Sequence, residues 1–116
     1  MQVVAHYSDI SEDVEVPVPV SNYYQGGIQV VWTPATGATG RVTIQSDIDG
    51  DGVWEEVTSA QISEVLCSLT YRFLDPLPEL VRVKLDLSSG WLERFNVFIQ
   101  GKGNKDETRS KRRQDR

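Results

Sequence analysis

Apolar and polar residues alternate along most of this chain, and this alternation limits the folds that are open to it. Successive side chains of a β-strand point to opposite faces, so an alternating run buries one face and exposes the other. A helix would need apolar residues three and four positions apart, and no such stripe is sustained. The alternating runs span residues 14–20, 28–33, 41–45, 65–73, 81–87 and 95–100.

Short segments rich in glycine, proline, aspartate and serine separate these runs, as expected of turns between antiparallel strands. They are residues 25–27, 34–40, 49–52, 75–78 and 88–90. The chain has 116 residues, which is enough for one domain and leaves no room for a second. We therefore expect an all-β fold, a single antiparallel β-sandwich or jelly roll of about seven or eight strands formed by residues 1–103.

Residues 104–116 are predicted to form a polar, basic tail. Residues 101–116 hold seven basic and three acidic side chains, whereas residues 1–100 hold five basic and fourteen acidic ones. Three roles stay open for the tail: contact with an acidic protein, contact with nucleic acid, or solubilisation. Nucleic acid is disfavoured as a partner, because the acidic body would repel it. The tail residues assigned to partner binding are Lys105, Arg109, Lys111, Arg112 and Arg113.

The sequence offers no assembled catalytic group. His6 is the one histidine, so triads and histidine-based metal sites lack parts. Cys67 lies on the apolar face of its run, where a small buried hydrophobe is expected, and no base is implied beside it. We therefore predict a protein that is not an enzyme and has no small-molecule substrate.

The N-terminal residues lack the charged, apolar and small-residue regions of a secretory signal. No run reaches the roughly 18 apolar residues that a membrane span needs. A single cysteine cannot form an internal disulfide, so the fold does not depend on an oxidising compartment. We expect synthesis in a cytoplasm and no membrane partner.

Three alternating aspartates make segment 47–55 the most chemically pointed part of the chain. Calcium takes about six to eight oxygen ligands, and its loops begin with Asp at alternate positions followed by Gly. The pattern resembles the short calcium loops of integrin-type propeller repeats. The ligands would be Asp47, Asp49, Asp51, the Val53 carbonyl and Glu55. The alternative is an ordinary hairpin turn, because Asp and Gly tolerate left-handed backbone.

The first alternating run is a candidate contact surface. Pro17 and Pro19 each lack a backbone donor, so this strand either lies at a sheet edge or is partly unpaired. An exposed edge can pair with a strand of another chain. We therefore assign Val14, Val16 and Val18 to partner binding.

The aromatic residues supply a second candidate surface. Trp32 is expected in the core and Trp54 beside its turn, which leaves Trp91 as the contact residue. Together with Tyr23 and Tyr24, Trp91 could form a platform on which a sugar stacks.

Several strand and turn segments follow one another in a particular order. They are a strand ending in Val31-Trp32-Thr33-Pro34, a Gly-x-Val-Thr-Ile-Gln-Ser strand (40–46), Asp51-Gly52-Val53-Trp54, a segment Pro-Leu-Pro-Glu-Leu-Val-Arg-Val (76–83), Ser89-Gly90, and a last strand ending in Gly-Lys-Gly (96–103). In these motifs residues 28–103 resemble a family of small β-sandwich proteins encoded among the virion structural genes of tailed bacteriophages. The extra aspartates of the hairpin and the extended basic tail depart from that pattern.

The resemblance implies a non-enzymatic structural protein of a phage virion, made in the host cytoplasm and located in the particle. It would bind neighbouring capsid or head–tail subunits in a decoration, cement or connector role. Its partners would be other virion proteins or further copies of itself. The alternative is a carbohydrate-binding or host-adhesion β-sandwich module with a calcium loop.

Overall fold

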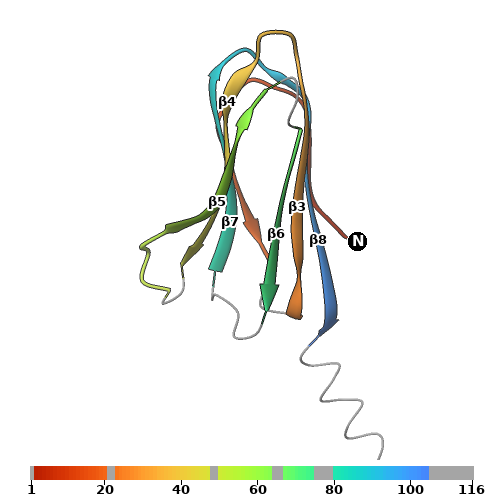
Figure 1. Cartoon of the computed structure of the whole chain (residues 1–116), viewed down its shortest axis with the longest axis vertical. Helices are drawn as coiled ribbons and strands as arrows, with labels where there is room; N and C mark the ends of the chain where they lie inside the picture. The colour runs from red at the N-terminus through yellow and green to blue at the C-terminus, as the bar shows by residue number, and fades with distance from the viewer. Residues whose placement is uncertain (1, 21–22, 48–49, 64–66, 75–79, 105–116) are drawn as a thin grey trace, which may run out of the picture.

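The computed structural model describes residues 2–20, 23–47, 50–63, 67–74 and 80–104. They form two four-stranded antiparallel sheets that pack face to face as a β-sandwich (Figure 1). The strands are β1 (Gln2–Ile10), β2 (Val14–Val18), β3 (Tyr23–Pro34), β4 (Thr39–Asp47), β5 (Glu55–Ile62), β6 (Ser68–Leu74), β7 (Leu80–Ser89) and β8 (Leu92–Asn104). Within the described ranges no helix is long and apolar enough to cross a membrane.

The order of the strands is that of a jelly roll. One sheet has the order β1-β8-β3-β6 and the other has the order β2-β7-β4-β5. Only the β4–β5 hairpin joins strands of the same sheet, and every other connection passes from one sheet to the other. Eight strands wound in this way form the double-sheet jelly roll. The fold class predicted from the alternation is confirmed.

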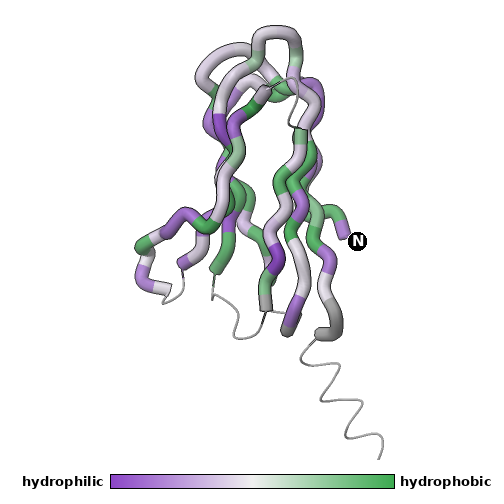
Figure 2. The backbone as a smooth tube through the Cα atoms, in the orientation of Figure 1, coloured by the Kyte–Doolittle hydropathy of each residue, from purple (hydrophilic) through white to green (hydrophobic). Residues whose placement is uncertain are grey.

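The core lies between the sheets and consists of the apolar halves of the alternating runs. Along the tube in Figure 2, apolar and polar residues alternate on the strands of both sheets. Each large side chain that faces inward contributes about 1.5–3 kcal/mol, so the alternation fixes which face of each strand is buried. The largest fully buried side chains are Trp32, Phe95, Ile28, Ile44, Leu85, Leu92, Ile99, Val20, Val30, Val42, Val83 and Val97.

The alternating runs of the sequence do not include β1 and β5, because bulges interrupt the alternation in these two pairings. The pairing of β1 with β8 shifts between Val3 and Ala5, and the pairing of β4 with β5 shifts between Ile44 and Gln45. A bulge inserts one unpaired residue and so breaks the period of two.

One predicted turn is wrong, because residues 25–27 lie inside a strand. Gly26 and Gly27 belong to β3 and pair on both sides, with β8 and with β6. Glycine is a common turn residue, but it also marks places where another backbone or a ligand approaches a strand closely. This correction bears directly on the candidate site.

Candidate binding site

The outward face of the β1-β8-β3-β6 sheet presents its side chains in rows that cross the strands. Antiparallel pairing sets residues directly opposite one another, so that their side chains are neighbours. Four rows follow from the register: Ser8, Arg94 and Thr33; His6, Asn96, Val31 and Ser68; Val3, Phe98, Gln29 and Thr70; and Gln100, Gly27 and Arg72. In the last row a glycine stands at the centre.

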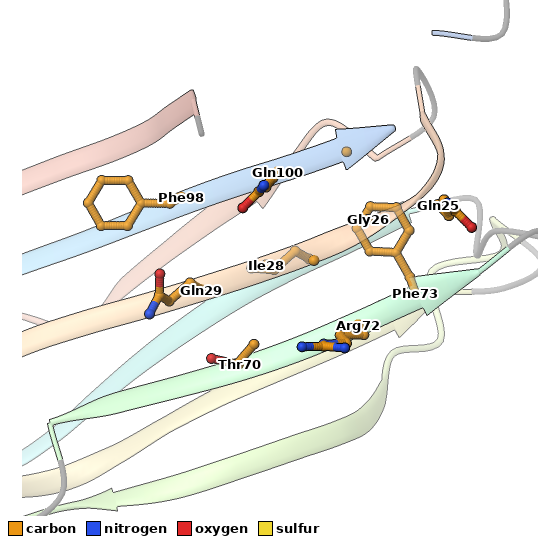
Figure 3. A pocket seen from close by; sticks show the side chains of 11 residues that line it. Gln25, Gly26, Ile28, Gln29, Thr70, Arg72, Phe73, Phe98 and Gln100 are labelled. Atoms are coloured by element: carbon orange, nitrogen blue, oxygen red, sulfur yellow. The ribbon is translucent and has the colours of Figure 1, made fainter. Parts of the chain in front are cut away.

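The missing side chain of Gly27 leaves a hollow in this face. The hollow has a volume of about 510 Å³ and is lined mainly by β8, β3 and β6. Figure 3 shows its wall residues on these three neighbouring strands, with Phe98 and Gln100 on β8 and Thr70 and Arg72 on β6. Gln25 and Gln29, two positions before and after Gly27, close the hollow along β3. The volume falls within the roughly 300–1,000 Å³ of ordinary ligand sites.

At Gly26 the neighbouring strands pack too closely for a side chain. A Cβ atom on Gly26 would overlap the carbonyl oxygen of Gln100 and would lie 2.8 Å from the Cα atom of Gly101. The ring of Phe73, the residue opposite on β6, is 3.0 Å from the same point. The aromatic ring thus covers the glycine, an arrangement that stabilises strand glycines. Gly26 permits close packing, whereas Gly27 leaves open space.

The walls of the hollow combine amides, a hydroxyl, a guanidinium and an aromatic ring. Each glutamine amide offers two donors and an acceptor, and Arg72 offers donors in a planar fork. Phe98 is half-buried and presents an apolar surface beside these groups. A ligand with hydroxyl groups and an apolar side would find partners for both. The described lining residues include no carboxylate, histidine or thiol, so they supply no general base that would activate the Thr70 hydroxyl.

Arg72 and Arg94 give this outer face a positive character in an acidic protein. Both side chains are exposed, and within the described part of the chain neither has a carboxylate partner. The four rows of outward side chains contain no aspartate or glutamate. Arg72 borders the hollow, while Arg94 lies outside it.

The outer face of the other sheet is occupied by its own side chains. Arg82 donates from Nε to Gln45 Oε1 at 2.8 Å and lies 3.4 Å from a carboxylate oxygen of Glu15. Its guanidinium also lies 4.1 Å from the centre of the Trp54 ring, a cation–π contact. Lys84 adds a second cation 3.9 Å from Glu15. These groups satisfy one another, which leaves the Gly27 hollow as the better candidate site.

In the acidic loop, the structure gives Asp47 a definite role. Asp47 is 1% exposed. Its Oδ1 accepts hydrogen bonds from the backbone N–H groups of Gly50 at 2.9 Å and Asp51 at 3.2 Å, and its Oδ2 accepts one from Gly52 at 2.8 Å. The carboxylate therefore holds the loop closed through its own backbone.

The calcium hypothesis is not tested by this geometry and stays a prediction. Asp51 Oδ1 accepts a hydrogen bond from the N–H of Val53, and Glu55 begins β5. Asp49 lies outside the described residues. Among the residues with described side chains, no three His, Cys, Asp or Glu are grouped to hold a metal. The loop connects β4 and β5, and none of its described residues lines the hollow.

The valines assigned to a partner are core residues in part. Val16 and Val18 are buried and Val14 is half-buried, all on the edge strand β2. The edge position follows the sequence argument, but only the backbone of β2 remains for a partner. A proline in a sheet lies with its nitrogen toward the free edge, so Pro17 leaves few donors there.

Trp91 is 42% exposed, so its side chain is accessible to a partner, as its assignment to partner binding requires. It follows the turn between β7 and β8, where its carbonyl oxygen accepts a hydrogen bond from the N–H of Ala35 at 3.1 Å. Ala35 follows Gly27 by eight residues, a distance of roughly 26 Å along an extended strand. Trp91 and the hollow are therefore separate surfaces. The tail residues Lys105, Arg109, Lys111, Arg112 and Arg113 lie outside the described residues.

The hollow was not predicted from the sequence. Its lining alternates in the sequence as Gln25, Gly27 and Gln29 on β3, and Phe98 and Gln100 on β8. The available signal was a glycine pair with alternating glutamines on both sides, which is compatible with a strand. Pairing with β6 could not be read from β3 alone.

The sequence matches no family model and no curated protein. The structure is similar to the crystal structure of Yersinia pseudotuberculosis-derived mitogen, with a TM-score of 0.59. The two chains are 16% identical, and the alignment covers 87% of each. At this identity the likeness establishes the fold alone.

The expected phage virion family is wrong, and with it the decoration, cement or connector role. The matching structure is that of a bacterial mitogen and not of a virion protein, and no family model supports the resemblance. The motifs behind the resemblance are strand and turn segments that any antiparallel sandwich of this kind needs. They carried information about the fold and none about the setting in which the fold is used.

Proposed function

We propose that this chain is a non-catalytic carbohydrate-binding module and that the Gly27 hollow is its binding site. The observation that carries the proposal is the hollow itself, an outer-face depression of about 510 Å³ with an aromatic ring and three glutamines in its walls. Sugar hydroxyl groups donate and accept hydrogen bonds, as glutamine amides do. The apolar C–H side of a sugar ring packs on an aromatic face such as Phe98.

The dimensions of the hollow support a ligand of one or two sugar rings. Gln25 and Gln29 are four residues apart on β3, which corresponds to about 13 Å. From β8 to β6 the width is two strand spacings, or about 10 Å. The protein with the similar structure is named a mitogen, and a glycan site would direct this chain to cell surfaces.

A glycan array with the full chain tests the proposal, together with a variant that fills the hollow. A Cβ atom on Gly27 would meet the Tyr71 carbonyl oxygen at 3.6 Å and Arg72 Cγ at 3.9 Å, which are ordinary contacts. Gly27→Leu should therefore fold and lose binding. Thr33→Leu places the same side chain on the same face of β3 outside the hollow and should keep binding. A silent array, or equal binding by both variants, would refute the proposal.

A second candidate function is recognition of a protein through Trp91. An exposed tryptophan is a frequent anchor of protein interfaces. Binding of labelled chain to cultured cells separates the two candidates. Loss of binding after protease treatment and in Trp91→Ala, with retention after glycosidase treatment, would favour the protein. Val53→Ala, at another exposed apolar residue, is the control.

A further inference from the structure

We infer that the Gly27 hollow selects sugars that carry a carboxylate, such as uronic acids, and that Arg72 is the residue that recognises the charge. This inference rests on the carbohydrate-binding function proposed above and names the chemical class of its ligand. Arg72 stands across Gly27 from Gln100, in the row that forms the centre of the hollow.

The first argument is the state of Arg72. Arg41 lies 3.4 Å from Glu56, and Arg82 and Lys84 both lie within 4 Å of Glu15. Arg72, in contrast, has no acidic partner among the described residues, although the first hundred residues hold fourteen acidic side chains. Among the described residues, no carboxylate competes with a ligand for its guanidinium.

The second argument is the charge of the surroundings. Apart from Arg72, the described lining residues supply amide, hydroxyl, apolar and backbone groups, so Arg72 is the one charged side chain among them. A carboxylate placed there meets an opposite charge and no described like charge. A neutral sugar makes the same hydrogen bonds to the glutamines, but from the guanidinium it gains only hydrogen bonds to neutral oxygens, which are weaker than those to a carboxylate.

The geometry of the charges favours a carboxylate over a phosphate. The planar fork of an arginine matches the two oxygens of a carboxylate in a bidentate pair. One guanidinium balances one negative charge, whereas a phosphate group carries about −1.5 to −2 at neutral pH. The glutamines then bind the ring hydroxyl groups, and Phe98 covers the apolar side of the ring.

The test compares two sugars that differ at one carbon, methyl glucuronide and methyl glucoside, with acetate as the charge without the sugar. Binding is followed by NMR through the backbone amides of residues 25–29, 70–72 and 98–101. The full chain should bind the glucuronide at least about tenfold more tightly than the glucoside, as expected of a hydrogen bond to a charged group. Acetate should bind far more weakly than the glucuronide.

Two variants assign the preference. Arg72→Gln should bind the two sugars with equal affinity, whereas Arg94→Gln, which removes the same charge from the same face outside the hollow, should keep the preference. Equal affinities for both sugars in the unmodified chain would overturn the inference and leave the carbohydrate function standing. Acetate that binds as tightly as the glucuronide would also overturn it. Absence of amide shifts with either sugar, together with a silent glycan array, would remove both proposals.

Discussion

The two adjacent glycines of β3 show how much the role of one residue depends on the side of the sheet it faces. Gly26 has no room for a methyl group, because the backbone of β8 lies against it. Gly27, its neighbour, faces the open hollow and has ordinary contact distances around its missing Cβ. Neither has a left-handed backbone, so packing alone separates them.

Substitution by alanine at each glycine should therefore change stability in opposite directions. Gly26→Ala should lower the free energy of unfolding by about 1–3 kcal/mol, the range for overpacked sites. Gly27→Ala should raise it by about 0.5–1 kcal/mol, because alanine reduces the entropy of the unfolded chain. Urea denaturation of both variants measures the difference. A loss of similar size in both would contradict this account of the hollow.

Asp47 is a second position where one side chain has a specific effect. Asp47→Ala leaves three loop N–H groups without their acceptor and should cost about 1–3 kcal/mol or more. Asp51→Ala, at an exposed residue that accepts one hydrogen bond, is the matched control and should stay within about 0.5 kcal/mol. Thermal or urea unfolding distinguishes them. Equal losses would show that Asp47 does not organise the loop.

The same thermal melts test calcium. An ion that binds only the folded chain raises the melting temperature, and a chelator then lowers it. The prediction from the sequence is a higher melting temperature in calcium chloride than in chelator. An unchanged temperature in both would leave the hydrogen bonds of Asp47 as the full explanation of this acidic loop.

At the scale of the element, the edge strands differ in how they meet solvent. β2 and β5 flank one sheet, and β1 and β6 flank the other. On β2, the exposed Pro17 removes a donor from the free edge, and Pro19 follows directly after the strand. Prolines of this kind protect an edge from pairing with other chains. The same prolines that identify the edge in the sequence therefore argue against strand addition there.

Restoring the donors should expose this edge. In the double variant Pro17→Val and Pro19→Val, one backbone N–H group returns to β2 and a second returns directly after the strand. We expect self-association that increases with protein concentration, measured by analytical ultracentrifugation against the unmodified chain. A variant that stays as monodisperse as the unmodified chain would show that the prolines do not protect the edge.

At the scale of the whole molecule, the chain divides by charge into an acidic body and a basic tail. Every residue of the buried cluster lies between Ile10 and Ile99. The tail contributes basic charge to a body in which fourteen acidic residues outnumber six basic ones. Stability should therefore come from the sandwich, and the tail should affect binding or solubility.

Deletion of residues 105–116 tests this division. The free energy of unfolding should change by less than about 0.5 kcal/mol, as for surface changes that touch no core contact. Sugar binding at the hollow should also persist, because the described residues that line it all lie on β3, β6 and β8. Chemical denaturation and NMR titration measure the two effects. A large loss of stability would mean that the tail belongs to the folded unit.

The fold could be predicted from the sequence because every second residue of a strand is buried. Ile28, Val30 and Trp32 are apolar residues at such alternate positions. The hollow could not be read in the same way. Its centre is the absence of a side chain at Gly27, and its walls come from strands about forty and seventy residues further on. Which strand pairs with which, and on which face, depends on long-range register. Gly26 and Gly27 also favour turns by composition, and only the pairing on both sides of β3 decides between the two structures.

The floor of the hollow is the backbone of a central strand, and this limits binding as well as supporting it. A floor held by hydrogen bonds on both sides needs little ordering when a ligand arrives, so little free energy is lost to it. A depression on a sheet face, however, contacts only one side of a sugar, and a single contact of this kind exchanges rapidly. Several copies on one support would raise the effective concentration and gain about 10²–10⁴ in avidity without any new contact. Such a surface would therefore gain a long residence time on its target from many copies acting together, rather than from a deeper site.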